Sequence, residues 1–192
     1  VQAQTLTGLT VALDPGHGGY DGGARAHDSG IWEKEINLQI ALAVEKELLA
    51  RGAQVVLTRR EDICLSEGDT ATKQRKRADL QARVDMAKAA GADVFLSIHL
   101  NQFSQAKYAG AQVFYGGAGQ ELALALQDRL RAVLDPENDR VCKPAPEGVF
   151  LMKNIQSPAV TIECGFLSNP EEEAKLRSAD YQKKLSAVIV SS

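Results

Sequence analysis

Short apolar segments alternate with amphipathic helical segments along almost the whole of this chain, and glycines stand at several of the joins. The clearest helix is predicted over residues 33–51, where apolar residues recur every four positions from Ile36 to Leu48 and Gly52 follows as a terminator. Repeated strand, glycine and helix units are typical of a mostly parallel, twisted sheet with helices on both faces. We therefore predict an α/β fold with about six strands.

The remaining elements follow from the same pattern, with a glycine-rich loop over 16–30 and a proline-containing loop over 135–147 near the expected crevice. The predicted strands cover residues 9–13, 54–58, 93–99, 111–115, 148–152 and 159–163. The predicted helices cover residues 33–51, 75–90 and 119–134, with one or two more in 170–190. We expect residues 1–192 to form a single domain, in which residues 1–7 are an N-terminal tail or an expression remnant.

Composition excludes several classes of partner. The 192 residues carry a formal net charge of -3, so the chain lacks the broad basic face that binds nucleic acid. Its one basic run, Lys73 to Arg77, is read as a solvated stretch before a helix or as a contact to an anionic polymer or a partner protein. No segment approaches the roughly twenty apolar residues that cross a bilayer, so we expect no membrane insertion by this chain. A signal or anchor segment removed ahead of Val1 is compatible with the sequence.

The three cysteines, Cys64, Cys142 and Cys164, are widely spaced and form no Cys-x-x-Cys pair. They match neither a disulfide framework nor a thiolate zinc site. Cys164 lies in an apolar segment, where a thiol behaves as a small buried hydrophobic group; a catalytic thiol is the alternative.

Two predicted strands are followed or closed by a histidine. His17 comes just after the strand at 9–13, and His99 ends the strand at 93–99. Because the carboxyl ends of parallel strands line the ligand crevice of an open sheet, we expect both imidazoles in one site. Each histidine alone has an ordinary interpretation as a hydrogen-bonded turn residue, whereas two converging imidazoles indicate a metal. Catalytic zinc takes three protein ligands and keeps one position open for water.

Glu33 and Glu35 are both candidates for the third ligand, since both lie at the start of the helix predicted over 33–51. In the first turn, Glu33 is stabilised in its ionised form by the positive end of the helix dipole. Glu35 points about 200° away around the helix, so the two are not expected to bind together. An ordinary N-terminal charge on a helix is the structural alternative for Glu33.

Glu163 closes the apolar strand at 159–163, where an unpaired buried carboxylate would be costly. It is therefore either a catalytic group or the partner of a cation. Asn101 lies two residues beyond His99 and so on the same face of the strand. It is a candidate to bind substrate or orient a ligand, with a turn residue as the alternative.

Several blocks of the sequence together resemble one family, the zinc-dependent N-acetylmuramoyl-L-alanine amidases of bacterial cell walls. They occur in the family's order and extend over nearly the whole chain. The blocks are Asp14-Pro-Gly-His-Gly-Gly-Tyr-Asp-Gly-Gly-Ala24, Glu33-Lys-Glu-Ile-Asn-Leu38, Leu57-Thr-Arg59, Ser97-Ile-His-Leu-Asn101 and Pro158-Ala-Val-Thr-Ile-Glu-Cys-Gly-Phe-Leu-Ser-Asn-Pro170.

The resemblance implies one zinc ion per chain, bound by His17, Glu33 and His99, with Glu163 as the catalytic carboxylate. It selects Glu33 over Glu35, because the family's ligand is the glutamate that precedes lysine in this block. The implied substrate is peptidoglycan, and the implied reaction is hydrolysis of the amide between the lactyl group of N-acetylmuramic acid and L-alanine of the stem peptide. Such an enzyme acts outside the cytoplasmic membrane, in the cell wall or spore cortex.

Residues 69–83 and 110–115 are most similar to the germination-specific spore amidases of this family. That similarity implies action on cortex peptidoglycan during formation of muramic-δ-lactam, and it is compatible with an activating partner protein. Only residues 102–109 separate the strand of His99 from the next, so the regulatory helix inserted there in some division amidases cannot fit. The alternatives are a division or autolytic amidase, a zinc exopeptidase and an inactive wall-binding regulator.

Overall fold

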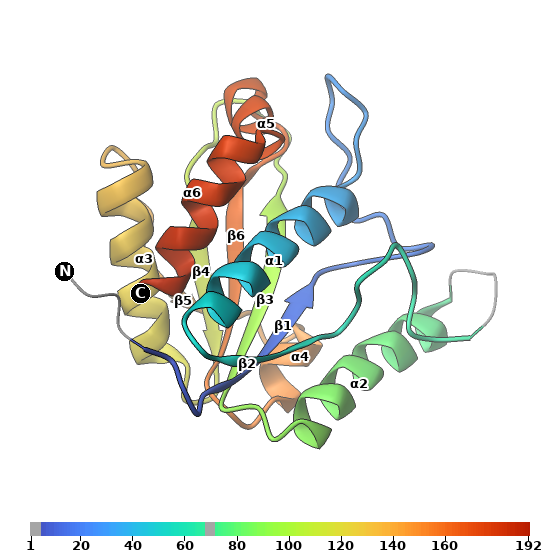
Figure 1. The fold of residues 1–192 in the computed structure, drawn as a ribbon. Coiled ribbons are helices and arrows are strands. Elements are labelled where there is room, and N and C mark those ends of the chain that lie inside the picture. Colours follow the sequence, from blue (N-terminus) through green and yellow to red (C-terminus); the bar gives the residue numbers. More distant parts are fainter. Residues whose placement is uncertain (1–4, 68–71) are drawn as a thin grey trace.

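A six-stranded sheet forms the centre of the protein, as shown by a computed structural model that describes residues 5–67 and 72–192 (Figure 1). The strand order is β2-β1-β3-β6-β4-β5, and all neighbours run parallel except β4 and β6. This architecture confirms the predicted mostly parallel α/β fold. The strands are β1 (Thr10–Pro15), β2 (Gln54–Leu57), β3 (Val94–Asn101), β4 (Gln112–Gly116), β5 (Lys143–Pro144) and β6 (Ala159–Phe166).

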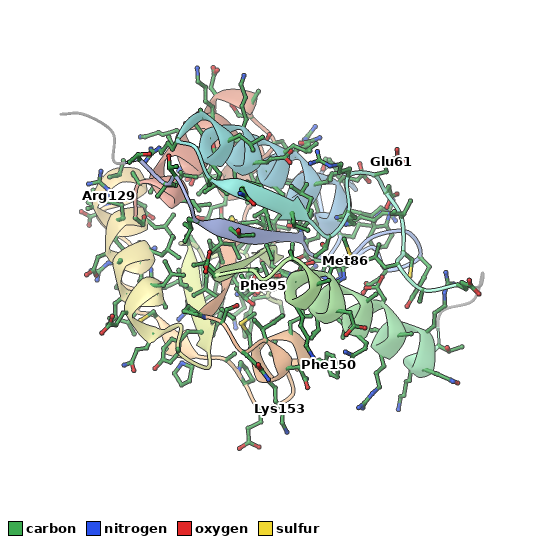
Figure 2. The ribbon with its side chains drawn as sticks, turned by 60° about the horizontal axis from the view of Figure 1, so that its bottom comes forward. Glu61, Met86, Phe95, Arg129, Phe150 and Lys153 are labelled. Atoms are coloured by element: carbon green, nitrogen blue, oxygen red, sulfur yellow. The ribbon has the colours of Figure 1, made fainter. Side chains whose placement is uncertain are left out.

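Helices cover both faces of the sheet. One face carries α1, α3 and α6, while α2 and α4 lie together on the other (Figures 1 and 2). The helices are α1 (Glu33–Ala50), α2 (Lys73–Ala89), α3 (Gln120–Leu134), α4 (Phe150–Asn154), α5 (Pro170–Leu176) and α6 (Ala179–Val190). The segment predicted to hold one or two helices therefore holds two.

The alternation of side chains along each strand divides the core into two parts. In β1, Val11 and Leu13 belong to the larger part under α1, α3 and α6, whereas Ala12 between them belongs to the smaller part under α2 and α4. Strand β3 repeats this division, since Leu96 packs in the larger part and the fully buried Phe95 in the smaller. Both faces of the central strands are thus buried, which explains why these segments are apolar throughout.

The prediction of a strand over residues 148–152 is wrong. Residues Phe150–Asn154 form the short helix α4, and the remaining strand is β5, within the segment predicted to be a loop. A short apolar run is equally compatible with a buried strand and with a buried turn of helix. Here Leu151 and Met152 are buried against the α2 side of the sheet, and Ile155 one turn later completes the same apolar surface.

The basic run Lys73 to Arg77 lies in the first turn of α2 rather than ahead of it, because the Thr72 side chain caps the helix at that point. The Arg75 guanidinium lies 4.3 Å from the centre of the Tyr20 ring, and Arg77 lies 5.4 Å from that of Phe150. Lys76 Nζ lies 3.2 Å from Asp21 Oδ2. These cations therefore contact the protein itself as well as solvent.

Across the described ranges, no helix has both the length and the apolar character needed to cross a membrane. Residues 102–111, which connect β3 to β4, contain no helix, as expected from the short spacing. At the N-terminal side, the Leu6 amide donates to the Arg51 carbonyl at 2.8 Å, which fixes this segment beside the end of α1.

Candidate metal centre

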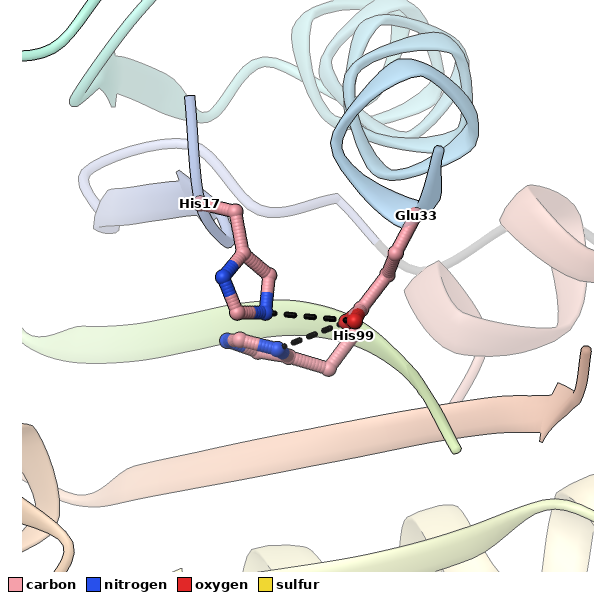
Figure 3. A group of neighbouring side chains, drawn as sticks. All are labelled: His17, Glu33 and His99. Atoms are coloured by element: carbon pink, nitrogen blue, oxygen red, sulfur yellow. Dashed lines mark hydrogen bonds and ion pairs between the residues drawn. The ribbon is translucent and has the colours of Figure 1, made fainter. Parts of the chain in front are cut away.

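A cavity of about 460 Å³ opens at the carboxyl ends of β1, β3 and β6. His17, His99, Asn101 and Glu163 line it, so the structure brings four of the five predicted site residues to one cavity. The fifth, Glu33, lies beside the two imidazoles and contacts both of them (Figure 3). On its other side the cavity is bounded by apolar residues of α4, which include Val149 at its N-cap and Phe150.

His17 follows β1 and turns its imidazole toward Glu33. Its Nε2 lies 3.2 Å from Glu33 Oε2, and its Nδ1 lies 2.9 Å from Asp21 Oδ1, an ion-pair distance without the alignment of a hydrogen bond. Burial lowers the pKa of His17, but the carboxylates of Asp21 and Glu33 outweigh it and raise the pKa to about 9. The same negative charges would stabilise a metal cation at Nε2.

His99 extends from β3 toward the same carboxylate, with its Nδ1 3.0 Å from Glu33 Oε1. The two imidazoles contact each other edge to face, with ring centroids 4.9 Å apart and planes at 76°. Gly16 lies against the His99 ring so closely that a Cβ at this position would come within 2.3 Å of its Cε1 and Nε2 atoms. Glycine is therefore required here to leave room for the imidazole.

Glu33 is buried, and the protein fixes both of its carboxylate oxygens. The Ala24 amide donates to Oε2 at 2.8 Å, and the Leu100 amide donates to Oε1 at 3.0 Å. Asn37, one helical turn further along α1, donates its Nδ2 to Oε1 at 3.2 Å. Burial raises the pKa of Glu33, but contacts with the two histidines outweigh it and leave the pKa well below its usual range. The carboxylate is thus ionised and immobile.

The donor atoms of His17, Glu33 and His99 all lie within 4.8 Å of one another and could hold one metal ion (Figure 3). Two imidazoles and one carboxylate make up one of the ligand sets that zinc adopts in hydrolytic enzymes. Fixed partners around the ligands, such as Asp21 beside His17 and Asn37 beside Glu33, are the usual second layer of such a site. The residues present therefore fit a metal of this kind.

Glu163 enters the cavity from β6, where it stands opposite His99 in the strand register. Its Oε2 is buried without a hydrogen-bond partner, and no ion pair in the described ranges includes it. Burial raises the pKa of Glu163 and the charge of Glu33 adds to this, while the two histidines oppose it; the net pKa is raised. The structure thus gives no support to the alternative of a cation partner.

Glu35 and Asn101 differ in their relation to the cavity. The Glu35 side chain accepts from the Trp32 amide at 3.4 Å at the N-terminus of α1, away from the two histidines. Asn101 lines the cavity, while its Oδ1 accepts from the Gln102 amide at 2.8 Å. Both readings of Asn101, as a turn residue and as a cavity residue, are therefore compatible with the structure.

Sequence reasoning did not assign roles to Asp21 and Asn37. Asn37 was detectable in principle, because it lies four residues after Glu33 and so on the same helix face. Asp21 had no comparable signal, since the approach of its carboxylate to His17 depends on the path of a glycine-rich loop.

An α/β sheet with a His-Glu-His group and a free carboxylate at the carboxyl ends of its strands defines a candidate metal-dependent hydrolase. The chain belongs to the Amidase_3 family of N-acetylmuramoyl-L-alanine amidases, whose model matches residues 11–192. It is thus an enzyme of the N-acetylmuramoyl-L-alanine amidase class.

Several amidases of known sequence or structure are similar to this chain over most of its length. The germination-specific N-acetylmuramoyl-L-alanine amidase of Bacillus subtilis is 39% identical over 188 residues, which cover 96% of this chain and 78% of that protein. The CwlD amidase of Clostridioides difficile, solved in complex with the GerS lipoprotein, is 40% identical with a TM-score of 0.89 and covers 95% of this chain and 94% of that one. The amidase AmiC2 of Nostoc punctiforme is 29% identical with a TM-score of 0.80, over 95% of this chain and 93% of that one.

Proposed function

We propose that this chain is a zinc-dependent amidase that cleaves spore cortex peptidoglycan between N-acetylmuramic acid and L-alanine, on the route to muramic-δ-lactam. The observation that carries the proposal is the unpaired carboxylate of Glu163 beside the His17, Glu33 and His99 group. A carboxylate without a structural partner, next to three converging ligands, is the arrangement that metal-assisted hydrolysis requires. The identities to the two germination-type amidases support the cortex as the site of action.

His17, Glu33 and His99 would hold the zinc ion, which when bound lowers the pKa of a water molecule and polarises a carbonyl. The backbone amides of Ala24 and Leu100 keep the Glu33 carboxylate in place. Asp21 keeps a negative charge beside His17 Nδ1, and Nε2 faces Glu33 and would be the nitrogen that holds the ion.

Glu163 accepts the proton from the attacking water and delivers it to the nitrogen of L-alanine as the amide bond breaks. Burial suits Glu163 for both steps, because it brings the pKa of the carboxyl closer to neutral pH than that of an exposed glutamate. Asn101 lines the cavity at the end of β3, and in this proposal it contacts the substrate. The apolar wall formed by Val149 and Phe150 gives the remaining part of the substrate a surface to pack against.

The proposal also covers where the enzyme acts and with which kind of partner, and both points are taken from its relatives. Peptidoglycan lies outside the cytoplasmic membrane, so the enzyme acts there. The CwlD amidase was solved with a lipoprotein bound, which supports the expectation that this chain also works with an activating partner protein.

The muropeptide profile of cortex peptidoglycan digested by the zinc-loaded protein tests the proposal. We expect free stem peptides that begin with L-alanine and, after the further enzymes of lactam formation act, muramic-δ-lactam. Release of single amino acids from peptide termini would instead identify an exopeptidase. Binding to the wall without cleavage, with and without candidate partner proteins, would identify a regulator.

A further inference from the structure

The backbone at His17 is held in an uncommon conformation. Its φ angle is 63°, and no other residue except glycine has a positive φ in the part of the chain that the structure describes. A side chain with a Cβ rarely adopts this left-handed region, and it persists only where the surrounding structure enforces it. The direction of the His17 imidazole depends on this backbone conformation, so the groups that enforce it control a candidate metal ligand.

Two buried guanidinium groups donate to three successive backbone carbonyls at the end of β1 and just after it. Arg83 of α2 donates Nη2 to the His17 carbonyl at 2.8 Å and Nη1 to the Pro15 carbonyl at 3.0 Å. Arg59 donates Nε to the same Pro15 carbonyl at 3.0 Å and Nη2 to the Gly16 carbonyl at 2.9 Å. The contact to His17 itself comes from Arg83.

Arg83 is itself fixed by two carboxylates. Its Nη1 lies 2.6 Å from Asp14 Oδ1 and its Nε lies 2.8 Å from Asp79 Oδ2, and only 2% of its side chain is exposed. Asp14 is also fully buried and accepts from the hydroxyls of Thr58 and Ser97, both at 2.7 Å. All three guanidinium nitrogens are thus engaged, and the nitrogen that reaches His17 has a single orientation.

We propose that Arg83 is a positioning residue for the metal centre. The Asp14 and Asp79 carboxylates hold Arg83 in place while it donates to the His17 carbonyl. Arg83 thereby holds the left-handed backbone that aims His17 Nε2 at Glu33 and His99. The planar guanidinium of arginine is required, because it donates in several fixed directions. A lysine ammonium cannot donate to Asp14, Asp79 and the His17 carbonyl at the same time. The inference rests on the proposed function, since it takes His17 to be a metal ligand.

The substitution Arg83→Lys tests this role while keeping a positive charge beside Asp14. We expect the variant to fold, and to bind zinc about 10- to 100-fold more weakly in competition with a chelator, the usual loss when a partner of a metal ligand is removed. The visible spectrum of the Co²⁺-loaded variant should differ from that of the wild type, because the spectrum reports the arrangement of the ligands. Arg51→Lys is the matched control, since Arg51 also donates to a backbone carbonyl, that of Val190, far from the cavity.

The double substitution Asp14→Asn with Arg83→Met covers the case in which Arg83→Lys unfolds, because it removes both charges of the buried pair together. We expect it to fold and to share the weakened zinc binding. Wild-type zinc affinity and an unchanged Co²⁺ spectrum in a folded variant would overturn the positioning role. His17→Ala separates the two hypotheses: if it binds zinc as tightly as the wild type, the proposed zinc site itself is wrong.

Discussion

His99 and Glu163 stand opposite each other in the register of β3 and β6, two parallel strands at the centre of the sheet. The distance between a candidate metal ligand and the candidate proton carrier is therefore set by backbone hydrogen bonds rather than by a loop. Such a placement on rigid elements keeps a reactive group aligned without a conformational change. It also allows the role of each side chain to be tested by substitutions that leave the sheet intact.

Glu163→Gln should keep the fold and the zinc content while the amidase rate falls about 10²- to 10⁴-fold, the usual contribution of a general acid–base group. Glutamine preserves the shape of the side chain but cannot accept the proton. Muropeptide release and zinc analysis on the same sample measure both properties. A variant that retains zinc and cleaves at the wild-type rate would exclude Glu163 from proton transfer.

Zinc should raise the melting temperature of the wild-type protein but not that of His99→Ala. A ligand present at a hundredfold excess over its Kd stabilises the folded state by about 2.7 kcal/mol. Differential scanning calorimetry with and without zinc measures the shift, and a chelator should reverse it. His27→Ala is the matched control, because the side chain of His27 is 92% exposed and Asp28 is its one ion-pair partner among the described residues. A zinc-dependent shift lost equally in both variants would contradict the assignment of His99.

Gly16→Ala should weaken zinc binding, because the new Cβ would come within 2.3 Å of the His99 ring. Overpacking of this kind costs about 1 to 3 kcal/mol of folding free energy. Chelator competition and urea unfolding measure the two effects. Gly148→Ala provides the comparison, since a Cβ there meets nothing within 4 Å, so this variant should match the wild type in both measurements.

Acid should destabilise the protein partly through Asp14. Burial raises the pKa of this carboxyl, but the Arg83 guanidinium and the hydroxyls of Ser97 and Thr58 outweigh it, so the pKa lies below its usual 3.8. The unfolded chain therefore takes up this proton first as the pH falls. The stability that ionised Asp14 contributes is fully present above pH 3.8 and is lost as the pH falls toward its folded-state pKa.

Urea unfolding of the metal-free protein between pH 7 and pH 3 measures this dependence. In the double variant Asp14→Asn with Arg83→Met, the fall in stability at the acid end should be smaller than in the wild type. An identical pH profile in the two proteins would show that other carboxylates account for the acid effect.

The long helices and all strands except β5 were predictable because each repeats a clear apolar pattern, and a glycine marks the end of some of them, as Gly52 does after α1. The pattern failed at residues 148–152, where an apolar run is too short to distinguish a strand from the helix α4. Such a run takes its conformation from the neighbours it packs against, and these come from α2 and β6.

The candidate site was predictable only in part. The spacing of residues suggested two histidines at strand ends, but it left Glu33 and Glu35 as alternatives until the likeness to a family selected one. The structure shows the physical difference, because Glu33 contacts the two histidines and accepts from two backbone amides, whereas Glu35 accepts from the Trp32 amide. The contact between Arg83 and Asp14 joins residues 69 positions apart, and no local pattern signals such a pair.

The position of β6 in the sheet has a consequence for how the chain matures. Strand β6 lies between β3 and β4, yet it comes from residues 159–166, near the end of the sequence. A nascent chain that lacks this segment keeps β3 and β4 apart, with two unprotected strand edges, and it also lacks Glu163. Insertion of this late central strand joins the two parts of the sheet and delivers the reactive carboxylate in one event. A partly synthesised chain therefore lacks both the strand that joins the two parts of the sheet and the candidate proton carrier, and it gains them together.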